Sequence, residues 1–187
     1  MTVMTYGDNI GSSMLKTLEH DPVFRSIAYF SMEIAIRPEI PTYSGGLGVL
    51  AGDILKSAAD LGVPAAAITL LYRKGYFIQS IDGEGNQKEQ PVEWKPEEFL
   101  TLLPNEVTVS LEGRPVKVRA WVYDQVGHAG YPLPIYFLDT DFEGNSPADR
   151  NLTWHLYGGD QRYRLCQELI RGVGGLRMLR DLGYRNI

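Results

Sequence analysis

The chain has 187 residues and a formal net charge of −5; 44% of the residues are hydrophobic and 22% are charged. This length and apolar content suffice for one domain with a sizeable core and exclude a disordered chain, and the acidic balance argues against nucleic acid as the main partner. A single cysteine, Cys166, excludes an internal disulfide and is typical of a reducing compartment.

The first 26 residues are largely polar, and we expect residues 1–26 to form an N-terminal arm. They carry neither a basic start nor an apolar run, so the sequence shows no signal peptide. The longest mostly apolar stretch, residues 62–72, is too short to span a bilayer. We therefore expect a cytoplasmic protein without a membrane partner.

The next part of the chain has the pattern of strand, helix and strand. Residues 27–33 and 65–72 are continuous apolar runs of strand length. Between them, apolar residues recur at helical spacing: Leu47, Leu50, Ile54, Ala58 and Leu61. Continuous rather than alternating strands indicate a parallel sheet that is covered on both faces, so the fold class is α/β.

Hairpin signals then mark an antiparallel β insertion across about residues 75–125. The turns "DGEG" and "EGRP" separate strand-like runs, and apolar residues alternate with polar ones in residues 116–122. Another strand follows at residues 133–138.

A final helix is expected from about residue 160 to residue 182. Its apolar residues form one stripe: Leu165, Leu169, Val173, Leu176 and Leu179. Three glycines within it, Gly172, Gly174 and Gly175, each cost about 1 kcal/mol of helix stability, which favours a site where another element packs closely. In an alternating α/β pattern a strand would follow, so residues 27–187 are interpreted as part of a larger lobe, truncated at the end of the chain.

The glycine-rich loop "YSGGLG", which precedes the first helix, has two interpretations. The spacing in "GLGVLA" resembles a dinucleotide fingerprint, but the first glycine does not directly follow a strand and the acidic residue expected after the second strand is absent. A glycine loop at a helix start can instead present free N–H groups to a phosphate. The alternative is a loop that only packs.

Longer segments around the loop resemble a known family. "YFSMEIAI", "PTYSGGLGVLAGDILKSAADLGVP", "LLYRKGYFIQ" and "LYGGDQRYRLCQELIRGVGGLRML" are similar, in order, to the amino-terminal region of the bacterial short-type α-glucan (glycogen, starch or maltodextrin) phosphorylases. The resemblance implies a Rossmann-like amino-terminal lobe of a two-lobe (GT-B) glycosyltransferase. It also implies a pyridoxal phosphate cofactor, whose lysine belongs to a carboxy-terminal lobe that this chain lacks.

The resemblance also implies the reaction and its partners. Such enzymes convert an α-1,4-glucan and orthophosphate to glucose 1-phosphate with retention of configuration. A further partner is the carboxy-terminal lobe of the same enzyme. An apolar surface facing that lobe would favour self-association, so a homo-oligomer stays open. This chain is expected to be inactive alone.

Site residues are carried over position by position. The amides of Gly46 and Leu47 resemble those that hold the substrate phosphate, and Gly45 and Gly48 shape the turn. The candidate catalytic residues follow: Glu33 beside the sugar phosphate site, and Asp160 in a mobile gating loop. Histidine spacing indicates no metal site.

Two other functions stay open. Glycogen or starch synthases also carry a G-G-L-G loop, but usually with a lysine shortly before it and an acidic residue after it, where this chain has Tyr43, Ser44 and Val49. The remaining alternative is a noncatalytic sugar-binding or interaction module.

Overall fold

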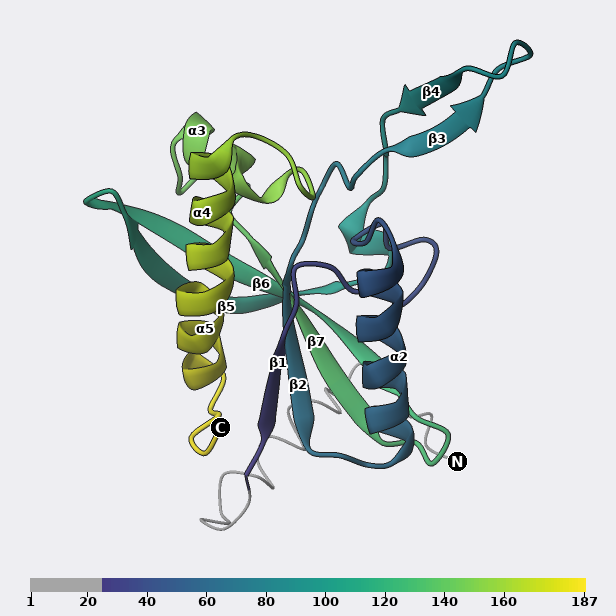
Figure 1. Cartoon of the computed structure of the whole chain (residues 1–187). Helices are drawn as coiled ribbons and strands as arrows, with labels where there is room; N and C mark the ends of the chain where they lie inside the picture. Colours follow the sequence, from purple (N-terminus) through teal and green to yellow (C-terminus); the bar gives the residue numbers. More distant parts are fainter. Residues whose placement is uncertain (1–24) are drawn as a thin grey trace, which may run out of the picture.

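A computed structural model describes residues 25–187, so most of the expected arm, residues 1–24, lies outside the described residues. The chain forms a five-stranded sheet in the order β1-β2-β7-β6-β5 (Figure 1). The strands are β1 (Ile27–Phe30), β2 (Ala65–Leu70), β5 (Thr101–Leu111), β6 (Arg114–Val126) and β7 (Pro132–Asp139). Strands β1, β2 and β7 are parallel, whereas β6 and β5 are antiparallel to their neighbours. The α/β class is confirmed, with both predicted parallel strands in one sheet.

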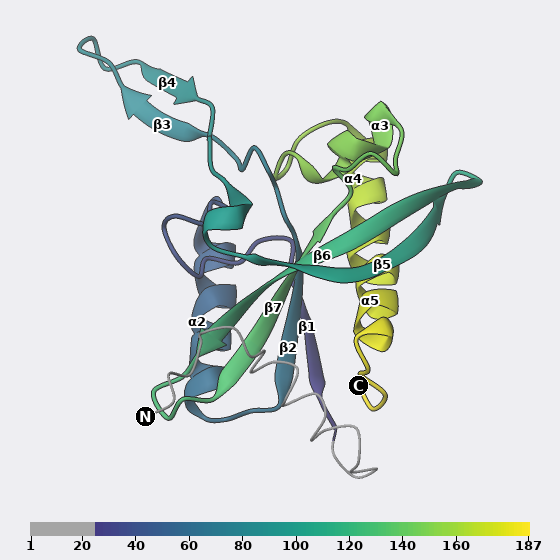
Figure 2. The ribbon, with the colours of Figure 1, turned by 180° about the vertical axis from the view of Figure 1, so that it is seen from behind.

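The antiparallel region between β2 and β7 divides into two parts. Strands β3 (Ile78–Ile81) and β4 (Gln87–Gln90) form a separate two-stranded sheet that projects from the body (Figures 1 and 2). Strands β5 and β6 instead continue the main sheet, because residues 119–126 of β6 pair with β7 and β5 pairs with β6. The alternating residues Val116, Val118 and Ala120 are fully buried there. Among the strands of residues 25–187, only β3 and β4 stand apart from the main sheet.

Helices cover the sheet on both faces. Helix α2 (Gly46–Asp60) lies on one face, and α4 (Gln161–Leu169) and α5 (Gly175–Asp181) lie on the other (Figures 1 and 2). Successive residues of β2 face opposite sides: Ile68 belongs to the core on the α5 side, and Ala67 to the core on the α2 side. This two-sided burial explains the continuous apolar run. No helix within the described part of the chain is long and apolar enough to cross a membrane.

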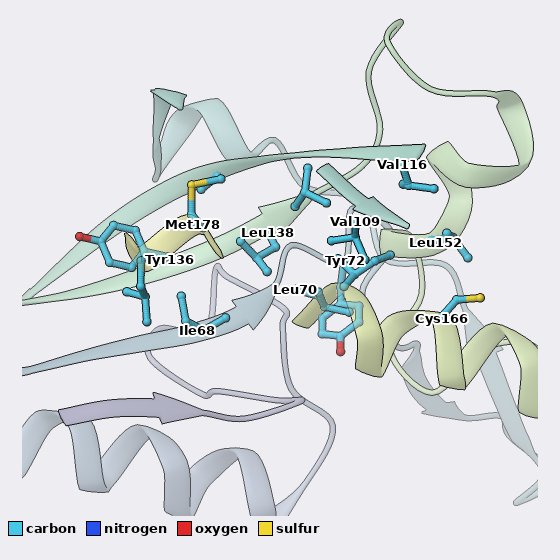
Figure 3. Close-up of a cluster of buried hydrophobic side chains, with 14 of the residues drawn as sticks. Ile68, Leu70, Tyr72, Val109, Val116, Tyr136, Leu138, Leu152, Cys166 and Met178 are labelled. Carbon is cyan, nitrogen blue, oxygen red and sulfur yellow. The ribbon is translucent and has the colours of Figure 1, made fainter. Parts of the chain in front are cut away.

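The larger core lies between the sheet and α4–α5 (Figure 3). It gathers side chains from β2, β5, β6 and β7 with the final helix, among them Ile68, Leu138, Ile170 and Met178. Cys166 is buried in it as a packing residue, as its small size suggests.

Helix α2 does not bury the apolar residues that predicted it. Leu47 and Leu50 are 70% and 57% exposed, whereas the buried face carries small residues, among them Gly52. A Cβ on Gly52 would lie 2.0 Å from the carbonyl oxygen of Ala35. The segment after β1 therefore crosses α2 at backbone distance, and only the small-residue face fits beneath it.

The final helix is interrupted by a π-helical segment, Ile170–Gly174, between α4 and α5. Gly175 packs there against the sheet, since an added Cβ would lie 2.7 Å from Ile68 Cγ2. This confirms close packing at Gly174 and Gly175, whereas a Cβ added at Gly172 would meet no atom of residues 25–187 within 4 Å. The predicted stripe is mostly exposed, as in α2; its exposed members are Leu165, Leu169, Val173 and Leu176.

Short helices connect the main elements. A 3-10 helix at Pro96–Glu98 precedes β5. After β7, α3 (Pro147–Arg150) and a 3-10 helix at Asn151–Thr153 lead to α4.

Asp124 of β6 is a partly buried carboxylate that we expect to destabilise the fold at neutral pH. Its Oδ1 atom is buried and has no hydrogen-bond partner among residues 25–187, and burial raises the pKa of this carboxyl group. Because the folded pKa lies above the unfolded one, stability falls as the pH rises from about 4 through the folded pKa. We expect Asp124→Asn to raise the free energy of unfolding by about 1 kcal/mol at pH 7, and by less near pH 4. Urea denaturation at both pH values measures the free energy of unfolding of the wild-type chain and of Asp124→Asn. An equal gain at pH 4 and at pH 7 would contradict the prediction.

Candidate functional site

Several loops gather at one end of the sheet, beyond the carboxyl ends of β1, β2 and β7. They are the glycine loop at the start of α2, residues 71–77 after β2, and residues 140–160 after β7 (Figure 1). In open α/β sheets this is where ligands bind.

Glu33 lies directly beneath the glycine loop. It is only 3% exposed, and its Oε2 accepts hydrogen bonds from the amides of Ser44 at 2.7 Å and Gly45 at 3.2 Å. Gly48 permits this arrangement, because an added Cβ would lie 2.9 Å from Glu33 Oε2 and 2.5 Å from Tyr43 Cβ. The loop is thus folded around a buried carboxylate.

The amides of Gly46 and Leu47 remain available to a ligand. They belong to the first turn of α2, where N–H groups have no intrahelical acceptor, and the bonds of the described residues give them no other partner. Both residues are exposed, and an added Cβ on Gly46 would meet no atom of the described part of the chain within 4 Å. Two free donors at the positive end of a helix dipole suit an anion that approaches the backbone closely.

Tyr157 connects the loop before α4 to Glu33. Its hydroxyl donates a hydrogen bond of 2.5 Å to Glu33 Oε1, and burial together with Glu33 raises the pKa of Tyr157 to about 12. Its backbone has a positive φ of 58°, which is uncommon for a bulky residue. The sequence reasoning missed Tyr157, although it stands beside the singled-out "GGD"; nothing local indicated a partner 124 residues away.

Asp160 lies in the same loop as Tyr157 but makes a different contact. Its Oδ1 accepts the amide of Tyr163 at 2.8 Å and caps α4. Gly159 precedes Asp160 in the chain, has a φ of 70° and packs against the Tyr163 ring. The structure therefore brings Glu33 and the glycine loop together, and the described contacts of Asp160 are those of a helix cap.

Asp139, at the end of β7, organises charges beside this site. It is fully buried, and its Oδ2 accepts hydrogen bonds from Arg73 at 2.8 Å, from Arg119 at 3.0 Å and from the indole of Trp121 at 3.1 Å. Burial opposes its ionisation, but the hydrogen bond and charge of Arg73 outweigh burial and lower the pKa. The Oδ1 of Asp139 also accepts the amide of Asp141 at 2.8 Å, so this carboxylate connects residues 71–77 with residues 140–160. No group of histidine, cysteine or carboxylate side chains among residues 25–187 could hold a metal ion.

Comparisons with known proteins match this chain to one family. The family model described as carbohydrate phosphorylase matches residues 36–122, which include the glycine loop. A maltodextrin phosphorylase of Thermococcus litoralis is 41% identical over 163 residues, covering 84% of this chain. The chain belongs to the carbohydrate phosphorylase family.

Two further relatives support the same family assignment. A glycogen phosphorylase of Mycobacterium tuberculosis is 46% identical over 162 residues, 82% of this chain, and one of Aquifex aeolicus is 32% identical over 169 residues, 87% of this chain. The aligned part is 19%, 18% and 24% of the length of these three relatives. The chain thus spans about a fifth of the phosphorylases that it matches.

Proposed function

We propose that this chain supplies the phosphate site of an α-1,4-glucan phosphorylase, which transfers a terminal glucosyl unit to orthophosphate and yields glucose 1-phosphate with retention. The observation that carries the proposal is the pair of amides at Gly46 and Leu47, which have no acceptor among the described residues and lie above the buried Glu33. The names of the relatives, maltodextrin phosphorylase and glycogen phosphorylase, supply the substrate class.

In this proposal each residue of the site has its own role. The amides of Gly46 and Leu47 bind the phosphate, while Ser44 and Gly45 offset the charge of Glu33. The Glu33 carboxylate, held by Tyr157, then faces the sugar side of the site. Asp160 is a candidate catalytic residue on the loop that also carries Tyr157. Movement of that loop opens and closes the site.

The remaining catalytic groups come from elsewhere. Pyridoxal phosphate needs a lysine for its Schiff base in an enclosed pocket, and none of the five lysines among residues 25–187 is buried. The cofactor therefore does not fit this part of the protein, and we place it in a second lobe of a GT-B architecture. The exposed Leu47, within the glycine loop, and the exposed Leu50, which follows it on α2, support a partner surface there.

Gly46→Val in the full-length enzyme tests the phosphate site. A Cβ added at Gly46 meets no atom of the described residues within 4 Å, and the valine side chain is expected to block the approach of an anion to the backbone. We expect orthophosphate affinity to fall by about 1.5–3 kcal/mol, roughly ten- to a hundredfold, measured by calorimetric titration. Gly172→Val, at a glycine with similar open space, is the matched control. Unchanged phosphate affinity in a folded Gly46→Val enzyme contradicts the assignment.

The 187-residue chain alone is expected to show no phosphorolysis. Two amides and a helix dipole position a phosphate but supply neither the proton donor nor the cations that stabilise a breaking glycosidic bond in a closed cleft. Incubation with glycogen, orthophosphate and pyridoxal phosphate measures this, with a full-length phosphorylase as positive control. Release of glucose 1-phosphate above a blank would contradict the proposal that this chain carries only part of the active site.

A further inference from the structure

Gln167 of α4 is a fully buried amide whose side chain binds the segment before Tyr157. Its Nε2 atom donates to the carbonyl of Leu152 at 2.9 Å and to the carbonyl of His155 at 3.0 Å. Its Oε1 atom is buried and has no hydrogen-bond partner among residues 25–187. A buried acceptor without a partner costs stability, and leucine or methionine would fill the same space without that cost. Packing alone therefore does not account for a glutamine at this position.

The two bonds of Gln167 complete the attachment of a short segment, residues 152–155. The carbonyls of Thr153 and Trp154, which lie between the two that Gln167 binds, accept backbone amides of the segment after β2 at 3.2 Å and 2.8 Å. Every carbonyl group from residue 152 to residue 155 is therefore bonded, two to the Gln167 side chain and two to the segment after β2. Loss of the Gln167 amide would free the carbonyl at each end of this segment.

Tyr157 follows this segment after a single residue and has a φ of 58°. Its hydroxyl donates to Glu33 Oε1 at 2.5 Å. Because a tyrosine side chain has only two χ angles, the position of its hydroxyl depends closely on the position of its backbone. A hydrogen bond weakens steeply as its geometry departs from the ideal. A small displacement of the His155 carbonyl would therefore separate Tyr157 from Glu33.

We propose that Gln167 is a positioning residue for Glu33. It acts through His155 and Tyr157, because its amide holds the backbone from which the tyrosine hydroxyl orients the carboxylate. The inference rests on the proposed function for the role of Glu33 in the reaction. The link from Gln167 to Tyr157 depends only on the hydrogen bonds and is tested without any activity.

The test follows Tyr157 by NMR in the 187-residue chain, with carbon-13 at the Cζ atoms of tyrosine. Tyr157→Phe assigns the resonance, and Glu33→Gln gives its position without a charged acceptor. Gln167→Met keeps the length of the side chain and removes both donors, so we expect it to move the Tyr157 resonance toward the Glu33→Gln position. Ile170→Val is the matched control. It alters a fully buried residue one turn further along the same helix that makes no side-chain hydrogen bond, and it is expected to leave the resonance in place.

An unmoved Tyr157 resonance in a folded Gln167→Met chain overturns the inference, because Gln167 then only packs. If Gln167→Met does not fold, Tyr157→Phe tests the same link from its other end, since coupling between two sites is reciprocal. The Nε2 protons of Gln167 should then exchange with water roughly threefold faster or more than in the wild-type chain. An unchanged exchange rate overturns the inference as well.

Kinetics of the full-length enzyme separate this inference from the proposed function. We expect Gln167→Met to lower kcat by about tenfold, because a misplaced group slows the reaction, and to leave the dissociation constant of orthophosphate unchanged. If Tyr157 moves and kcat does not change, the inference is overturned and the phosphate site stands. If Gly46→Val leaves phosphate affinity unchanged, the proposed function fails, whereas the NMR result for Gln167 is unaffected.

Discussion

Asp139→Ala is expected to lower the free energy of unfolding by about 3–5 kcal/mol, because it leaves two largely buried guanidinium groups without their shared carboxylate. Asp139 is fully buried, and Arg73 and Arg119 both donate to its Oδ2 atom. A small domain has about 5–15 kcal/mol of stability in total, so this one substitution removes a large share. Urea denaturation followed by circular dichroism measures the loss.

Two further variants make this experiment specific. Glu143→Ala removes an exposed carboxylate from the following loop and is expected to change stability by less than about 0.5 kcal/mol. Asp139→Asn keeps the shape and one acceptor, so its cost should lie between those of the two alanine variants. A loss below about 1 kcal/mol for Asp139→Ala would show that water replaces the carboxylate.

The effect of Asp139 depends on pH in a defined direction. Its folded pKa is lowered, so its contribution is fully present above the unfolded pKa of about 3.9 and is lost as the pH falls through the folded pKa. The stability difference between the wild-type chain and Asp139→Ala should therefore be constant around neutral pH and shrink in acid.

Gly52→Ala is expected to destabilise the chain by about 3 kcal/mol or more, above the usual range for overpacking. The added Cβ would lie 2.0 Å from the carbonyl oxygen of Ala35 and 2.8 Å from its carbonyl carbon. Backbone atoms cannot rotate away as a side chain does, so α2 and the segment after β1 must separate. Glu33 and the glycine loop lie at this junction, and the shift should also reach them.

Gly172→Ala is the matched control for Gly52→Ala. It is also a helical glycine, but its Cβ would meet open space. The higher helix propensity of alanine should then stabilise the chain by up to about 1 kcal/mol. Equal midpoints of thermal unfolding for the two variants would contradict the close approach at Gly52.

Local sequence patterns determined much of the secondary structure of this protein. The two continuous apolar runs predicted parallel strands that are covered on both faces, and β1 and β2 lie in that position. The glycines before a helical pattern predicted a helix start with exposed amides, which α2 presents. Such features depend on residues within a few positions of one another, where side-chain period and backbone freedom leave few alternatives.

The face that each helix buries was decided only in the tertiary structure. The helical period indicated an apolar stripe on α2, but the crossing of Ala35 favours the small side, and Leu47 and Leu50 stay exposed. Period alone identifies a face and not the element that covers it, because the covering element comes from another part of the chain.

The contacts of the site were likewise decided by the fold. Tyr157 reaches Glu33 across 124 residues, and Arg73 reaches Asp139 across 66. Neither pair leaves a trace in local composition, since each depends on where the ends of strands β1, β2 and β7 meet. The sequence therefore determined which residue types could serve at a phosphate site, and the packing of the sheet decided which of them meet there.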